Sequence, residues 1–223
     1  WRFDLVTTSS SPAAPDPFKS STIGTIAPTA FAISYNGSPL YSAIDGNTTG
    51  AKVQAITAAP SLVRHPSAVG YLVIFGTGKY FESTDGTVDS TRAMSLYGIW
   101  DKSTKGETTT TRVSPKRTNL QAQTITEEAT TNPFKANESV QGLRLLSDNP
   151  VDWATKSGWY LDFKVAGTST NTGEMLINPM AARGKVILLN TLTPNSDPCK
   201  EGVDSWLYGL NPATGGATTF NVF

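Results

Sequence analysis

Only a few residues of this sequence have the types and spacing that metal binding or catalysis requires. Asp85, Thr87 and Asp89 place side-chain oxygens at alternate positions, as the start of a calcium-binding loop does. The twelfth position counted from Asp85 is Leu96, where such a loop needs a bidentate carboxylate. We therefore interpret this segment as a turn between strands. Asp85, Thr87 and Asp89 are the weak candidate metal ligands, and we otherwise expect no metal site.

The candidates for catalysis are weaker still. His65 is the single histidine, so a Ser-His-Asp triad or a polyhistidine metal site would depend on this one residue. Its position between Arg64 and Pro66 favours a packed or turn-capping role. Residues 76–79 resemble a phosphate-binding loop, but the glycine spacing is too short and no Ser or Thr follows Lys79. We name no catalytic residue and predict that the chain is not an enzyme.

Composition excludes several classes of partner. The 223 residues contain 18 Lys and Arg against 18 Asp and Glu, so the formal net charge is zero. A neutral chain without a basic cluster has no general attraction to nucleic acid or anionic lipid. No run of apolar residues is long enough to span a membrane. Cys199 is the single cysteine, so no disulfide forms within the chain.

The apolar segments are short, rich in β-branched and aromatic residues, and separated by turn residues, which predicts an all-β fold. We expect strands near residues 1–6, 52–57, 70–76, 93–100, 119–125, 139–146, 158–164, 174–180, 184–191 and 205–210. Short helical turns are conceivable at residues 126–129 and 179–182. Residues 7–20 and 101–117 lack an apolar pattern and are expected to be surface loops.

A weak internal repeat narrows the choice among all-β architectures. Residues 96–101, with the sequence LYGIWD, resemble residues 207–212, LYGLNP. Recurring aromatic strands with glycine turns are typical of β-propeller blades. We predict that residues 1–223 form a single β-propeller region with blades of antiparallel strands, incomplete in itself and part of a larger propeller. Trp100, Trp159 and Trp206 are expected in its core.

Several longer motifs point to one family. Residues 70–82 (GYLVIFGTGKYFE) resemble the signature strand and turn of PilY-type type IV pilus biogenesis proteins. Further segments agree in order and spacing, namely residues 54–60 with 64–66, 95–101, 157–163, 173–194 and 197–208. The chain is therefore identified as similar to the C-terminal β-propeller domain of these proteins, over nearly its whole length.

The resemblance implies a secreted protein at the cell surface or pilus tip that supports pilus assembly, surface attachment and twitching motility. The implied partners are the remaining propeller sequence, minor pilins and a host or abiotic surface. The family's calcium site would lie in a loop before residue 1, so we expect no cofactor in this chain. Two alternatives stay open, a quinone-dependent propeller dehydrogenase and a carbohydrate-binding β-sandwich, and the sequence does not identify binding residues.

Overall fold

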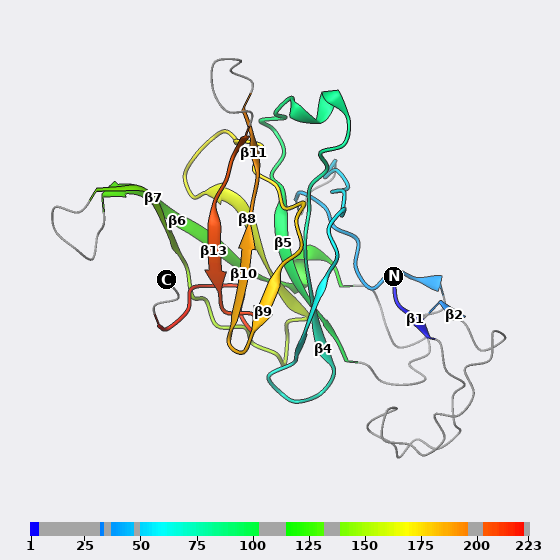
Figure 1. The fold of residues 1–223 in the computed structure, drawn as a ribbon. Coiled ribbons are helices and arrows are strands. Elements are labelled where there is room, and N and C mark those ends of the chain that lie inside the picture. The colour runs from blue at the N-terminus through cyan, green and yellow to red at the C-terminus, as the bar shows by residue number, and fades with distance from the viewer. Residues whose placement is uncertain are drawn as a thin grey trace, which may run out of the picture.

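The computed structural model describes residues 1–4, 32–33, 37–46, 50–102, 115–131, 139–195 and 203–220. These residues form strands and connecting loops, with two short 3-10 turns, η2 (Ser83–Gly86) and η3 (Arg117–Asn119) (Figure 1). The all-β prediction is confirmed. The strands are β1 (Phe3–Asp4), β2 (Ala32–Ile33), β3 (Ser61–Arg64), β4 (Tyr71–Gly76), β5 (Ser95–Asp101), β6 (Gln121–Thr131), β7 (Ser139–Leu146), β8 (Gly158–Val165), β9 (Ala181–Arg183), β10 (Val186–Asn190), β11 (Thr193–Pro194), β12 (Val203–Asp204) and β13 (Leu207–Leu210).

The largest sheet has six strands in the order β3-β4-β5-β8-β6-β7. Its first four strands, β3-β4-β5-β8, pair antiparallel, as expected for a propeller blade. The hairpin of β6 and β7 lies between β5 and β8 in sequence, and β6 joins β8 in parallel. The expected antiparallel pairing therefore holds for the described pairs of this sheet other than β6 with β8. In the sheet, β8 lies between β5 and β6, although it follows both in sequence. As a result, β6 and β8 are neighbours that run in the same direction.

A second sheet with the order β13-β10-β9 packs against one face of the six-stranded sheet. The contact is made by alternate residues of β4, β5 and β8, whose side chains point to the same face because a strand has a period of two. The apolar cluster between the sheets includes Leu72, Leu96, Leu161, Ile187 and Leu210, all fully buried.

Trp159 occupies the centre of this cluster and is fully buried, as predicted for a core tryptophan. Its indole Nε1 donates a hydrogen bond to the Pro212 carbonyl, 3.1 Å away. Trp100 and Trp206 are half-buried and pack against the same cluster. Trp206 lies just before β13, so the expected strand at residues 205–210 begins two residues later.

The opposite face of the six-stranded sheet is also apolar. Phe75, Tyr97 and Ile99 form a second buried cluster there with Leu40 and Tyr41, which come from residues 37–46. A two-sheet sandwich alternates inward apolar residues with outward polar ones along each strand. A sheet covered by apolar residues on both faces instead suits a blade packed between two neighbours.

Two expected strands are absent, and neither of the two possible helical turns forms. Residues 52–57 and 174–180 contribute only isolated bridges, between Ile44 and Val53 and between Met175 and Leu192. Both segments contain apolar residues in a pattern that favours a strand. A strand also requires backbone pairing with a neighbouring strand over several residues, which these segments lack. Residues 126–129 belong to β6, because pairing with β7 overrides the helix preference of Glu127 and Glu128. Residues 181–182 likewise lie in β9 rather than in a turn.

Some sequence predictions fall outside the described residues. Cys199, the expected loop at residues 7–20 and most of the expected loop at residues 101–117 are among them. In the part of the chain that the structure describes, no helix has the length and apolarity needed to cross a bilayer.

Candidate functional site

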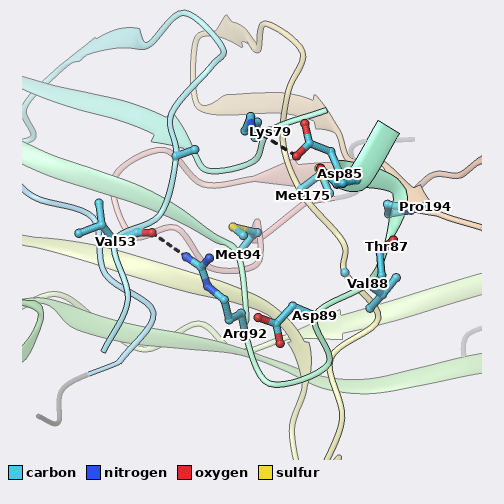
Figure 2. Close-up of a pocket in the computed structure, with 13 residues that line it drawn as sticks. Val53, Lys79, Asp85, Thr87, Val88, Asp89, Arg92, Met94, Met175 and Pro194 are labelled. Carbon is cyan, nitrogen blue, oxygen red and sulfur yellow. Dashed lines mark hydrogen bonds and ion pairs between the residues drawn. The ribbon is translucent and has the colours of Figure 1, made fainter. Parts of the chain in front are cut away.

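A pocket of about 320 Å³ lies at one end of the two sheets, under the long connection between β4 and β5 (Figure 2). That connection supplies most of its wall, and short segments near residues 53, 174 and 194 complete it. The lining residues are Val53, Ala55, Lys79, Thr84, Asp85, Thr87, Val88, Asp89, Arg92, Met94, Gly173, Met175 and Pro194.

One wall of the pocket is built by η2. The Asp85 carboxylate accepts hydrogen bonds through Oδ2 from the backbone N–H groups of Phe81 (2.8 Å) and Glu82 (2.9 Å). These bonds hold the pKa of Asp85 below its usual range, with a smaller contribution from Lys79. Lys79 Nζ lies 3.5 Å from Asp85 Oδ1 and 3.0 Å from Glu82 Oε1. The Asp85 side chain therefore caps a turn and pairs with a cation.

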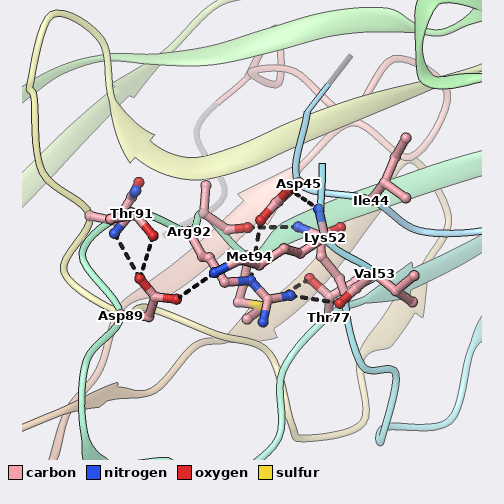
Figure 3. A network of polar contacts seen from close by, with 12 residues as sticks. Ile44, Asp45, Lys52, Val53, Thr77, Asp89, Thr91, Arg92 and Met94 are labelled. Atoms are coloured by element: carbon pink, nitrogen blue, oxygen red, sulfur yellow. Dashed lines mark hydrogen bonds and ion pairs between the residues drawn. The ribbon is translucent and has the colours of Figure 1, made fainter. Parts of the chain in front are cut away.

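The opposite wall is a polar network that joins three segments of the chain (Figure 3). Arg92 donates from Nε to Asp45 Oδ2 at 3.2 Å and from Nη2 to the Val53 carbonyl at 2.6 Å. Asp89 accepts hydrogen bonds through Oδ1 from the Thr91 backbone and hydroxyl, which lower the pKa of its carboxyl group. Lys52 Nζ lies 3.5 Å from Asp89 Oδ2. This network ties the β4–β5 connection to Asp45, Lys52 and Val53.

The three weak candidate metal ligands, Asp85, Thr87 and Asp89, all line this pocket. Asp85 and Asp89 lie on different walls, and both are engaged by N–H or hydroxyl donors and by a lysine. Within the described ranges, no three His, Cys, Asp or Glu side chains come together as a metal site would require.

His65 does not line the pocket. Its ring stacks on Trp100 with centroids 3.9 Å apart and meets the edge of Trp153 at 4.3 Å. The Ser67 backbone N–H donates to His65 Nδ1, which assigns the proton of the neutral ring to Nε2. Nε2 is buried and has no hydrogen-bond partner among the residues that the structure describes. Burial, followed by the nearby charge of Lys102, lowers the pKa of His65. The expected packed role of this histidine is confirmed.

Comparison with known proteins identifies the family. The sequence profile of the PilY1 beta-propeller domain matches residues 1–138. The chain belongs to this family. Type IV pilus biogenesis factor PilY1 of Pseudomonas aeruginosa is 51% identical over 229 residues, which cover 100% of this chain and 19% of that protein. A PilY1 homolog of Xylella fastidiosa is 31% identical over 181 residues, covering 81% of this chain and 11% of the homolog.

A solved structure agrees with this assignment. The crystal structure of the Pseudomonas aeruginosa PilY1 C-terminal domain matches with a TM-score of 0.81 and 46% identity, over 99% of this chain and 43% of that chain. The predicted propeller class is thereby confirmed. This chain spans about a fifth of the length of the Pseudomonas PilY1 proteins that it matches.

Sequence reasoning missed two buried arginines in this PilY1-type domain. Arg117, on η3, is 3% exposed and makes a bidentate ion pair with Asp162 of β8. Its guanidinium group also lies 3.9 Å from the centre of the Tyr160 ring and donates to the Tyr97 hydroxyl at 2.5 Å. Arg117 thereby fixes the start of β6 against β5 and β8.

The second buried arginine, Arg144, connects the inserted hairpin of β6 and β7 to the three-stranded sheet. It pairs with Glu174 at 2.5 Å, donates to the Tyr208 hydroxyl and lies 3.9 Å over the Trp206 ring. Glu174 also accepts hydrogen bonds from Thr191 (2.6 Å) and Tyr208 (2.7 Å). A lone charge inside an apolar strand pattern, as in residues 139–146, was the available signal for such a site.

Proposed function

We propose that this chain is a structural domain of a non-enzymatic factor in type IV pilus biogenesis. The observation that carries the proposal is the family match, since the chain aligns over its full length with proteins named type IV pilus biogenesis factor PilY1. The chain spans only about a fifth of the length of those proteins. We therefore propose this function for the chain as one part of a larger protein.

The use of charged side chains in the core supports a scaffold role. Arg117 and Asp162, and likewise Arg144 and Glu174, pair between segments that are distant in sequence. Arg117, Arg144 and Glu174 are buried in these pairs, and separating the segments would leave a buried charge without its partner. Both arginines therefore serve the rigidity of the domain.

The proposal extends to the role of the whole factor. We propose that it acts at the cell surface or pilus tip in attachment and twitching motility, with the rest of the propeller and minor pilins as partners and a host or abiotic surface as its target. We further propose that the calcium site implied by the family resemblance lies in a part of the whole factor other than this chain.

A domain exchange tests the proposal. The equivalent region of Pseudomonas aeruginosa PilY1 is replaced by this chain, and the chimera is expressed in a strain that lacks its own PilY1. We expect surface pili and twitching to return, because the 51% identity preserves the fold and its contacts. A chimera with Trp159→Ala leaves a cavity in the core and is expected not to restore pili or twitching. A chimera with Lys185→Ala, at an exposed position, is expected to restore both as the unaltered chimera does.

Two results would contradict the proposal. One is normal piliation by a PilY1 that lacks the whole region. The other is an enzyme activity of the purified chain, measured as dye reduction with an added quinone cofactor, which would favour the dehydrogenase alternative.

A further inference from the structure

The turn between β3 and β4, residues 65–70, has a strained backbone. Ala68 has a φ of 62°, in the left-handed region that residues other than glycine rarely adopt. Gly70, with a φ of 69°, has no room for a side chain, because a Cβ atom would overlap the Asp101 carbonyl at the end of β5. A strained backbone persists only where surrounding contacts hold it in place. The shape of this turn therefore depends on its contacts with neighbouring segments.

His65 and Val69 attach the turn to those neighbours. The His65 side chain is 2% exposed, and its ring lies parallel to that of Trp100 on β5, with centroids 3.9 Å apart and 6° between the planes. A second contact, edge to face, joins the ring to Trp153 at 4.3 Å. In return, the Trp100 indole Nε1 donates a hydrogen bond to the Val69 carbonyl at 2.9 Å. One imidazole and two indole rings thus hold the turn in place.

These contacts suit the neutral imidazole and not the charged one. His65 Nδ1 accepts a hydrogen bond from the Ser67 backbone N–H at 3.1 Å, and the Ser67 hydroxyl oxygen lies 2.7 Å away. Both ring nitrogens of a protonated histidine are donors. Protonation of Nδ1 would therefore leave the Ser67 N–H without its acceptor and facing a second N–H. Nε2 is buried and, within the described residues, has no acceptor that would stabilise a charged ring.

Among the described residues, no carboxylate forms a hydrogen bond with the His65 ring. The charged residues within three positions of His65, Trp100 or Trp153 in sequence are Arg64, Asp101, Lys102, Asp152 and Lys156. Asp101 pairs with Arg2 at 2.8 Å. Asp152 accepts hydrogen bonds from the Ala154 N–H at 3.1 Å and from the Thr155 hydroxyl at 2.8 Å. Both carboxylates are therefore engaged by other groups.

The cations around the ring oppose its protonation. Arg64 donates to the Ala68 carbonyl at 3.3 Å, and Lys156 donates to the Thr118 carbonyl at 3.4 Å. Lys102 Nζ lies 4.6 Å from the centre of the Trp100 ring. Burial, followed by the charge of Lys102, lowers the pKa of His65. Opening of the turn would expose the ring to water and relieve both effects.

We propose that His65 is a pH-sensitive switch for the β3–β4 turn. The neutral ring holds the turn against Trp100 and Trp153, and protonation of His65 releases it while the sheets stay folded. Because the closed turn lowers the pKa of His65, the closed form loses stability as the pH falls below about 6.5, the ordinary value of an exposed histidine. The open form relaxes Ala68 and uncovers the two indole rings. This switch depends only on the contacts of the turn, so it stands whether or not the chain acts in pilus biogenesis.

The indole N–H groups provide the measurement. The purified chain, labelled with ¹⁵N at tryptophan, is followed by NMR between about pH 8 and pH 4.5, a range that contains the ordinary pKa of histidine. We expect the Trp100 indole signal, which reports the hydrogen bond to the Val69 carbonyl, to move with the same midpoint as the His65 ring protons. The Trp159 indole donates to the Pro212 carbonyl in the core, and its signal is expected not to move.

Three variants make the test specific. His65→Gln stays uncharged over this range and is expected to abolish the movement of the Trp100 signal. Lys102→Met removes the opposing charge and is expected to tighten proton binding at least about twofold, as for a unit charge several ångströms away in water, which moves the midpoint to higher pH. Lys185→Met, at an exposed position between β9 and β10, is the matched control and is expected to leave the midpoint unchanged.

Four outcomes would overturn the proposal. The Trp100 signal stays in place over the whole pH range, or it moves equally in His65→Gln. The Trp159 signal changes at the same midpoint as the Trp100 signal, which would mean that the whole domain unfolds. The last outcome is one common midpoint for Lys102→Met and Lys185→Met, and it keeps the proposal testable if His65→Gln does not fold.

Discussion

Trp159 of β8 lies directly against Gly98 of β5, its cross-strand neighbour in the six-stranded sheet. A Cβ atom added to Gly98 would stand 2.5 Å from the indole Nε1, closer than real Cβ atoms approach any neighbour. Gly215 contacts the same indole ring, and its Cβ would stand 2.5 Å from Cζ3. The largest side chain of the core thus depends on two glycines that leave room for it.

Gly98→Ala should therefore destabilise the domain by about 1–3 kcal/mol, because the fully buried indole ring has no space into which it can move. Urea denaturation followed by circular dichroism measures the change. Gly46→Ala is the matched control, since its Cβ would meet Ala51 at an ordinary 3.8 Å. Equal stability of the two variants would show that the side chains around Trp159 rearrange to accept the added methyl group.

Arg144→Met should cost about 3–5 kcal/mol, because it leaves the Glu174 carboxylate buried without its ion-pair partner. The double variant Arg144→Met with Glu174→Met should lose clearly less than the sum of the two single variants, since neither buried charge remains. Chemical denaturation of all four proteins gives the coupling energy. Additive losses would mean that the two charges do not stabilise each other.

Acid should weaken the packing around His65. The pKa of this buried imidazole is lowered in the folded chain, so the unfolded chain binds the proton more readily. The free energy of unfolding should therefore be insensitive to this residue above its ordinary pKa of about 6.5 and fall as the pH drops below it. Denaturation curves between about pH 8 and pH 5 test this, because carboxylates titrate mostly below that range.

His65 is the single histidine of the chain, so the variant His65→Gln is the control for this pH dependence. The fall in stability below about pH 6.5 should be smaller in the variant than in the wild type. The same slope in both proteins would assign the effect to other groups.

The chain by itself should bind calcium more weakly than about 10⁻⁵ M, because the Asp85 and Asp89 oxygens are already engaged by backbone, threonine and lysine donors. Titration calorimetry with CaCl₂ is the measurement. Tighter binding that disappears in Asp85→Asn would show that these carboxylates form a metal site after all.

The sequence by itself determined the fold class and most of the strands. Residues 70–76 and 139–146 are short apolar segments next to turn residues, and both form strands at those positions. Such a pattern is local and can be recognised without knowledge of any partner strand. The order and spacing of several such motifs also identified the family.

Only the tertiary structure decided which segments have partners. Residues 52–57 look like a strand and form a single bridge, whereas β3, four residues between two prolines, pairs along its length with β4. The same is true of the charged groups. Asp85 and Asp89 stand out by spacing, but Lys52 and Asp45, which pair with Asp89 and Arg92 of the β4–β5 connection, come from an earlier part of the chain.

Arg117 with Asp162, and Arg144 with Glu174, are the clearest cases. Each residue is an ordinary charge in the sequence, and the two members of a pair are separated by 45 and 30 positions. The burial of Arg117, Arg144 and Glu174 is tolerable only because folding brings the opposite charge within contact. Such pairing depends on long-range strand order, including the insertion of the β6–β7 hairpin into the blade, which no local pattern of residues encodes.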